Sequence, residues 1–179
     1  LTVFARHPRA HLELRTKSVA TRILEKSTPL PHVITAFSFT PQEISDVIER
    51  GVPSVSARIH AMQKLAEKGW PLGIRLDPVI ECSDFTKRYE SLIREIFLTV
   101  PSESIHSVSV GPFRLPEPFF KKMEKLYPQE PLFAGNFEKR GKSISYRREI
   151  ESQRIQTCKE LLLQNISIEK LFLCHPNEE

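Results

Sequence analysis

Residues 69–80, with the sequence GWPLGIRLDPVI, constrain the fold more than any other stretch of the chain. A segment with helical apolar spacing ends at Gly69, and apolar and polar residues then alternate from Leu72 to Asp77. This period of two is typical of a strand. We expect Pro78 to close the strand, because proline has no N–H to donate to a β-ladder. A helix that stops on glycine and leads directly into a strand is one unit of an α/β fold.

The same unit recurs along the chain. Strands are expected at 11–16, 33–39, 72–77 and 105–110, with a short closing strand at 171–174. Helices are expected between them, with the hydroxyl residues Ser18, Thr40 and Ser56 as N-caps. This order predicts a parallel sheet with helical crossovers, that is, half of a (β/α) barrel.

The chain of 179 residues is long enough for one domain with a core. We expect 1–112 to form the half-barrel, and 113–179 to close it and extend it within the same domain. No apolar run approaches the ~20 residues that span a bilayer, so we expect no membrane partner. Three widely spaced cysteines do not make a disulfide framework, so we expect reduced thiols in a cytoplasmic protein. The chain starts at Leu1 and not at methionine, so further residues are expected before it.

Positive charge is concentrated in one segment. Residues 113–148 hold nine Lys and Arg against four Glu, whereas the whole chain has a net charge of only +4. Within it, 137–147 reads as a short hairpin around Gly141, with Lys139, Arg140 and Lys142 close to its turn. Such asymmetry indicates either a polyanionic partner or a solvated basic face.

Common catalytic motifs are absent: the sequence has no phosphate-binding glycine loop, no Cys-x-x-Cys and no His-Glu-x-x-His. Its six histidines lack the spacing of metal ligands. Cys82 follows a strand end and is either a reactive thiol or a small apolar residue. Arg75 and Asp77 share one face of their strand, where they either neutralise each other or bind a ligand.

Three polar residues coincide with strand ends. Lys17, Ser38 and Asp77 follow or end the first three strands, and the carboxyl ends of parallel strands meet at one edge of a sheet. An ammonium beside a hydroxyl is a binding site for a carboxylate. The same pattern also fits an exposed lysine and a serine that merely fills a strand end.

Four collinear segments carry a family resemblance. They are LRTKS at 14–18, AFSF at 36–39, SARIHAMQKL at 56–65 and GWPLG at 69–73. Together they resemble the C-terminal half of the spore photoproduct lyase family, radical S-adenosylmethionine enzymes that repair a thymine dimer in DNA. The resemblance continues through Phe113 and the basic hairpin, and so covers nearly the whole chain.

The resemblance implies an α/β fold of the partial (β/α)6 type, with a C-terminal basic β-hairpin and helix. It implies that Lys17 and Ser38 hold the methionine carboxylate of S-adenosylmethionine, and that the strand end at Asp77 lies beside the adenosyl group through backbone atoms. Lys139, Arg140 and Lys142 would contact DNA.

The Cys-x-x-x-Cys-x-x-Cys motif that ligates a 4Fe–4S cluster is absent from the 179 residues. The resemblance implies that these ligands lie upstream, in an N-terminal half of the same protein, and that the present chain is inactive alone. Two other interpretations remain open. One is a nucleic-acid-binding module without catalysis on a barrel scaffold, and the other is a barrel enzyme of unrelated chemistry that uses Arg75 and Asp77.

Overall fold

A five-stranded parallel sheet organises the computed structural model, which describes residues 1–174. Its strands, in the spatial order β1-β2-β3-β4-β8, are β1 Leu12–Thr16, β2 Val33–Ser38, β3 Leu72–Val79, β4 Ile105–Pro112 and β8 Leu171–Leu173. All four pairings are parallel, as the sequence predicts. The carboxyl ends of the strands therefore lie along one edge.

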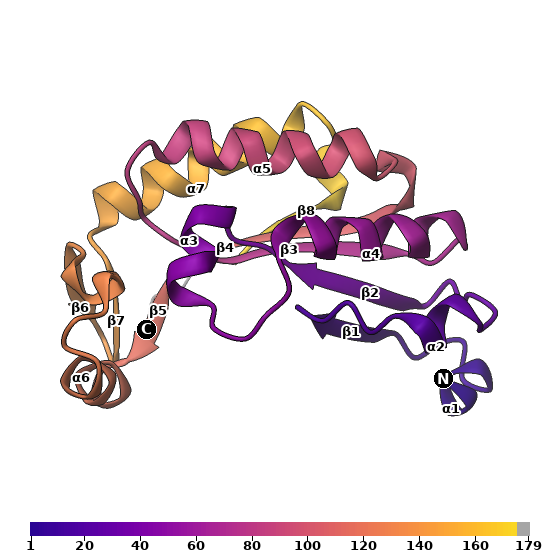
Figure 1. Ribbon diagram of the computed structural model, residues 1–179, viewed down its shortest axis with the longest axis horizontal. Helices are drawn as coiled ribbons and strands as arrows, with labels where there is room; N and C mark the ends of the chain where they lie inside the picture. Colours follow the sequence, from indigo (N-terminus) through magenta and orange to yellow (C-terminus); the bar gives the residue numbers. More distant parts are fainter. Residues whose placement is uncertain (175–179) are drawn as a thin grey trace.

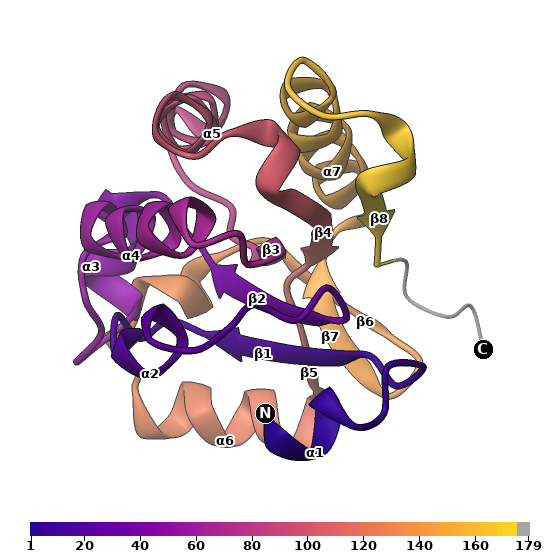
Figure 2. The ribbon, with the colours of Figure 1, turned by 90° about the vertical axis from the view of Figure 1, so that its right-hand side faces the viewer.

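Helices connect the strands. They are α1 Thr2–Ala5, α2 Arg22–Glu25, α3 Gln42–Ile48, α4 Val55–Glu67, α5 Phe85–Thr99, α6 Glu117–Leu126 and α7 Arg148–Leu163, with short 3-10 turns at Ser102–Ser104, Pro131–Ala134 and Ile168–Lys170. The sheet is curved, and α4, α5 and α7 lie along its outer side (Figures 1 and 2). None of the helices in the described part of the chain is both long enough and apolar enough to cross a membrane.

The main core lies between the sheet and these outer helices. Leu72, Ile74 and Leu76 are fully buried, because the strand period of two turns all three toward the helices. Trp70 and Tyr89 are the large aromatic side chains of this core. The alternate residues of β3 face the inner, concave side of the sheet, where the polar residues gather.

A second, smaller unit lies beyond the carboxyl ends of the strands, at the left of Figure 1. It is an antiparallel sheet in the order β5-β7-β6, built from β5 Arg114–Pro116, β6 Phe137–Arg140 and β7 Ser143–Tyr146, with α6 packed against it. Its own apolar cluster is centred on Phe113, Phe120 and Tyr146. The hairpin of β6 and β7 is as the sequence predicts, but β5 was not expected.

The structure corrects the expected end of β3. The strand continues past Pro78 to Val79, and the register with β4 shifts between Leu76 and Val79. Such an irregularity lets a residue without an N–H remain inside a strand.

Helix starts also differ from the expectation. Ser54, not Ser56, caps α4, with its hydroxyl accepting from Ala57 N at 3.2 Å. The helix expected from Ser18 begins only at Arg22, because the Ser18 hydroxyl accepts from Ala20 N in a local turn. Thr40 does not cap α3 either, since its hydroxyl donates to Glu49.

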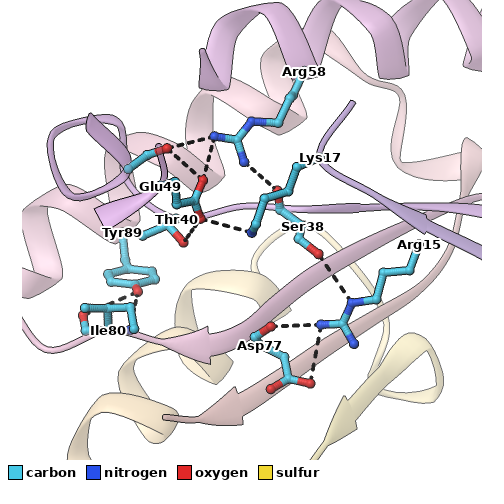
Figure 3. A network of polar contacts seen from close by, with 10 residues as sticks. Arg15, Lys17, Ser38, Thr40, Glu49, Arg58, Asp77, Ile80 and Tyr89 are labelled. Carbon is cyan, nitrogen blue, oxygen red and sulfur yellow. Dashed lines mark hydrogen bonds and ion pairs between the residues drawn. The ribbon is translucent and has the colours of Figure 1, made fainter. Parts of the chain in front are cut away.

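The loop after β3 is tied to the core by Tyr89. The fully buried Tyr89 hydroxyl accepts from Ile80 N at 2.8 Å and donates to Ile80 O at 3.4 Å (Figure 3). This loop leaves the edge of the sheet where the strand ends gather, so Tyr89 fixes the position of the backbone next to that edge.

Replacing Tyr89 by phenylalanine removes both hydrogen bonds and leaves two buried backbone groups without a partner. We expect Tyr89→Phe to lower the free energy of unfolding by about 1–3 kcal/mol, the cost of unsatisfied buried groups. Urea denaturation measures it. Tyr127→Phe, at a half-exposed tyrosine, is the control and should leave the free energy of unfolding almost unchanged. Equal stability of Tyr89→Phe and the wild type would contradict the assigned role of the hydroxyl.

Candidate functional site

The three residues expected at the strand ends do gather at one edge of the sheet. Lys17 follows β1, Ser38 ends β2 and Asp77 lies near the end of β3 (Figure 3). Parallel pairing of β1 with β2 and of β2 with β3 produces this arrangement. Ser38 is buried, whereas the side chains of Lys17 and Asp77 are about one-third exposed, at 35% and 30%.

Arg15 joins two of these residues. Its Nε donates to Ser38 Oγ at 3.3 Å, and its Nη2 donates to the Asp77 carbonyl at 2.8 Å and to Asp77 Oδ2 at 3.4 Å. The ion pair links the first and third strands across the second. One interpretation of the sequence paired Asp77 with Arg75. In the structure Asp77 pairs with Arg15 instead.

Lys17 forms an ion pair with Glu49 at the end of α3. Lys17 Nζ lies 3.0 Å from Glu49 Oε1. The same carboxylate accepts hydrogen bonds from Thr40 Oγ1 at 3.0 Å, Ser45 Oγ at 2.8 Å and Arg58 Nη2 at 3.0 Å. Only 9% of the Glu49 side chain is exposed, so the carboxylate is held almost entirely by the protein.

Arg58 extends the network to Ser38. Its side chain, on α4, is fully buried, and its Nη1 donates to the carbonyl oxygen of Ser38 at 2.9 Å. Lys17, Glu49, Arg58 and Ser38 thus belong to one hydrogen-bonded network (Figure 3). Sequence reasoning did not assign a role to Arg15, Glu49 or Arg58. The one available signal was an arginine within the apolar face of a helix, a position that requires a buried partner.

The surroundings of Glu49 favour its ionised form. Burial acts most strongly and opposes ionisation, but hydrogen bonds from Lys17 and Ser45 and the charges of Lys17 and Arg58 together outweigh it. The pKa of Glu49 is consequently lower than its ordinary value. The Glu49 carboxylate is therefore ionised at neutral pH.

Arg75 is fully used by internal contacts. It donates to both carboxylate oxygens of Glu13, at 3.0 and 2.7 Å, and to the backbone oxygens of Ile74 and Ser107 and the Ser107 hydroxyl. These bonds occupy all five N–H donors of a guanidinium. The hydrogen bond from Arg75 lowers the pKa of Glu13, against the effect of burial. Arg75 and Asp77 therefore do not form a paired reactive site.

Gly73 makes room for this contact. A Cβ at residue 73 would lie 2.9 Å from Arg75 Nη2 and 2.9 Å from the Cβ of Ala36. Only glycine lets the guanidinium lie across the strand at this point.

The expected DNA-binding residues differ in their availability. Lys139 is 57% exposed and pairs with Glu117 on α6 at 2.6 Å. Arg140 is 20% exposed, pairs with Glu151 on α7 and donates to the Tyr146 carbonyl at 2.6 Å. Lys142 forms no side-chain hydrogen bond or ion pair with the other described residues.

The cysteines are poor nucleophiles. Burial raises the pKa of the Cys82 thiol to about 11 and that of Cys158 to about 12. Within residues 1–174, no three His, Cys, Asp or Glu side chains are grouped as metal ligands. His175, one of the scattered histidines, lies outside the described residues.

The donor set fits the amino-acid part of S-adenosylmethionine. Lys17 and Arg58 carry two positive charges against the single carboxylate of Glu49, which leaves one positive charge for an anionic group. A lysine ammonium has three N–H donors, and Glu49 takes one from Lys17. The exposed side of Lys17 is thus suited to a carboxylate.

The pKa of Glu49 predicts how stability depends on pH. Its pKa in the folded protein lies below the ordinary 4.5, so its stabilising contribution is present above that pH and is lost as the pH falls through the folded pKa. We expect the free energy of unfolding of Glu49→Gln to lie furthest below that of the wild type at neutral pH, and the gap to shrink as the pH falls below 4.5. Chemical denaturation across this range measures it.

Glu43→Gln is the matched control, since Glu43 is an exposed glutamate on the same helix that pairs with Arg88. It should change the free energy of unfolding little at any pH, because exposed ion pairs contribute little. A gap for Glu49→Gln that is constant with pH would contradict the prediction.

Comparison with solved structures relates the fold to spore photoproduct lyases. A spore photoproduct lyase complexed with dinucleoside spore photoproduct has a TM-score of 0.74 at 19% identity, over 91% of this chain and 50% of that chain. A double mutant of the lyase with bound AdoMet and dinucleoside spore photoproduct has a TM-score of 0.70 at 18% identity, with the same coverage. The chain thus shares their α/β fold with a parallel sheet and spans about half their length.

A search of curated protein sequences finds no match. The family model of spore photoproduct lyase matches residues 1–169, nearly the whole chain, and this protein therefore belongs to the spore photoproduct lyase family.

Proposed function

We propose that this chain is the C-terminal part of a radical S-adenosylmethionine lyase that repairs a thymine photoproduct in DNA. Family membership supports the reaction class. The observation that carries the proposal is the partly exposed side chain of Lys17 at the strand edge, in one network with Ser38. We place the protein in the cytoplasm, because its three cysteines are free thiols.

Each strand end has a separate task in binding the cofactor. The Lys17 ammonium attracts the methionine carboxylate, and the Ser38 hydroxyl supplies a directional donor. Arg15 holds Asp77 through both its carbonyl and its carboxylate, which fixes the backbone that would lie beside the adenosyl group. A bound S-adenosylmethionine next to a 4Fe–4S cluster would supply the radical chemistry of such a lyase.

The cluster ligands would come from the other half of the protein. Three ligands must converge on one cluster, and the described residues contain no such group. We infer that preceding strands pair with the free edge of β1 and complete a partial (β/α)6 barrel, since β1 is an outer strand of the sheet and consecutive strands usually pair. Alone, the present chain would be inactive.

The hairpin is the proposed DNA contact. Lys142 is free to meet a phosphate, and the exposed Lys139 can exchange its partner Glu117 for one, because surface ion pairs contribute little. Arg140, by contrast, ties the hairpin to α7 through Glu151. We therefore give Lys139 and Lys142 the phosphate contacts and Arg140 the task of orienting them.

Loss of the Lys17 ammonium should weaken cofactor binding. In the intact protein, Lys17→Ala should reduce the affinity for S-adenosylmethionine by about 1.5–3 kcal/mol, the contribution of a charged hydrogen bond. Ser38→Ala should cost about half as much, because its donor is neutral. Calorimetry measures both, and Lys68→Ala, just after α4, is the control that should bind like the wild type.

Wild-type affinity in both Lys17→Ala and Ser38→Ala would remove these residues from the cofactor site. If the intact wild type bound DNA but no S-adenosylmethionine, the non-catalytic nucleic-acid-binding module would replace the lyase as the proposed function.

Removing the two hairpin lysines should change the salt dependence of DNA binding. Each phosphate contact contributes about 0.9 to the slope of log K against log salt on duplex DNA, so Lys139→Ala with Lys142→Ala should reduce the slope by about two. Binding titrations at several salt concentrations measure it. The control, Lys26→Ala with Lys68→Ala, removes two lysines remote from the hairpin, after α2 and α4, and should leave the slope unchanged. An unchanged slope in the hairpin variant would show that DNA is held elsewhere.

A further inference from the structure

Glu49 collects donors from four separate parts of the chain. Its Oε1 accepts from Lys17 after β1 and from Thr40 after β2, and its Oε2 accepts from Ser45 on α3 and from Arg58 on α4. A nearly buried carboxylate with four donors is fixed in position, because each lone pair is occupied and few other rotamers are open to it.

Arg58 carries this order to the backbone of the second strand. Nη1 donates to the Ser38 carbonyl at 2.9 Å, and Nη2 donates to Ser45 Oγ at 2.8 Å and to Glu49 Oε2 at 3.0 Å. One guanidinium thus fixes Ser38 relative to Glu49 (Figure 3). Since a guanidinium is planar and rigid, it holds its three partners in a set geometry.

Lys17 is the most exposed of the charged residues that pair around Glu49. The Arg58 side chain is 0% exposed and that of Glu49 is 9% exposed, whereas the Lys17 side chain is 35% exposed. Among the charged residues around Glu49, the side chain that reaches solvent is therefore that of Lys17. A long, flexible lysine side chain loses much rotamer entropy when it is ordered by a ligand, unless the protein has already ordered it.

We propose that Glu49 and Arg58 are positioning residues for the carboxylate of S-adenosylmethionine: Glu49 orients the Lys17 ammonium, and Arg58 orients Ser38. This inference rests on the proposed function and adds two residues that act through others and touch no ligand atom themselves. It requires that their effect on binding depends on the carboxylate of the ligand.

The test compares two ligands of the intact holoprotein. S-adenosylmethionine carries the carboxylate, and decarboxylated S-adenosylmethionine lacks it. We expect Glu49→Gln to bind S-adenosylmethionine about tenfold more weakly than the wild type, equal to about 1.4 kcal/mol, while its affinity for the decarboxylated ligand stays unchanged. Calorimetry measures both affinities without any turnover.

A double-mutant cycle tests whether Glu49 acts through Lys17. Lys17→Ala with Glu49→Gln should bind S-adenosylmethionine no more weakly than Lys17→Ala alone, because the orienting residue has lost its target. Glu43→Gln on the same helix is the control, and should bind both ligands like the wild type.

A second variant distinguishes a direct loss of binding from misfolding. Glu49→Gln leaves the buried Arg58 without a charged partner, whereas Glu49→Gln with Arg58→Met removes both charges together. This double variant should show the same selective loss for S-adenosylmethionine.

The remaining outcomes would all overturn the inference. A full wild-type preference for the carboxylate ligand in both Glu49 variants would overturn the inference and leave the proposed function standing. An equal loss for the two ligands would show that the network only supports the fold, and would overturn it as well. A wild-type protein that binds neither ligand would refute the proposed cofactor role and the inference with it, and one that binds both equally would overturn the carboxylate contact and with it the inference.

Discussion

The buried guanidinium of Arg58 is the constraint on which this edge of the sheet depends. A charge that is removed from water is tolerated only where partners satisfy it, and here the partners come from β2 and α3. These contacts hold the ends of β1, β2 and α3 around Glu49. The remaining positive charge belongs to Lys17, whose side chain is partly exposed. The main core can therefore be strongly apolar, while the ligand-facing edge is defined by a few ion pairs.

The strands were predictable, because alternation such as that of Leu72, Ile74 and Leu76 is a local property of the sequence. The helix starts were less so. Thr40 has the sequence of an N-cap, but a buried carboxylate nine residues later takes its hydroxyl. A local pattern cannot reveal this competition, because Glu49 is fixed there by Arg58 from the following helix.

The residues of the site likewise divide into those that local sequence predicts and those that it does not. Lys17, Ser38 and Asp77 were found because parallel strand ends share an edge, but the pairing of Arg15 with Asp77 spans 62 residues and leaves no trace in local sequence. In the hairpin, the sequence gives the number of positive charges but does not show which of them are free to contact a partner. Arg140 is as basic as its neighbours, yet Glu151 from α7 engages it. Charge counted along a sequence measures what is present, and only the fold decides how much of it faces a partner.

Both inner-face arginine pairs cross the second strand. Arg75 on β3 reaches Glu13 on β1 above Ala36, and Arg15 on β1 reaches Asp77 on β3 above Ser38. Strands two apart lie about 9.6 Å from each other in a flat sheet, so side chains that bridge them draw the outer strands toward the inner side. These two braces favour the concave shape seen in Figure 2. The curvature of the sheet therefore depends on these ion pairs as well as on backbone twist. The same curvature sets the width of the opening that any neighbouring strands must match.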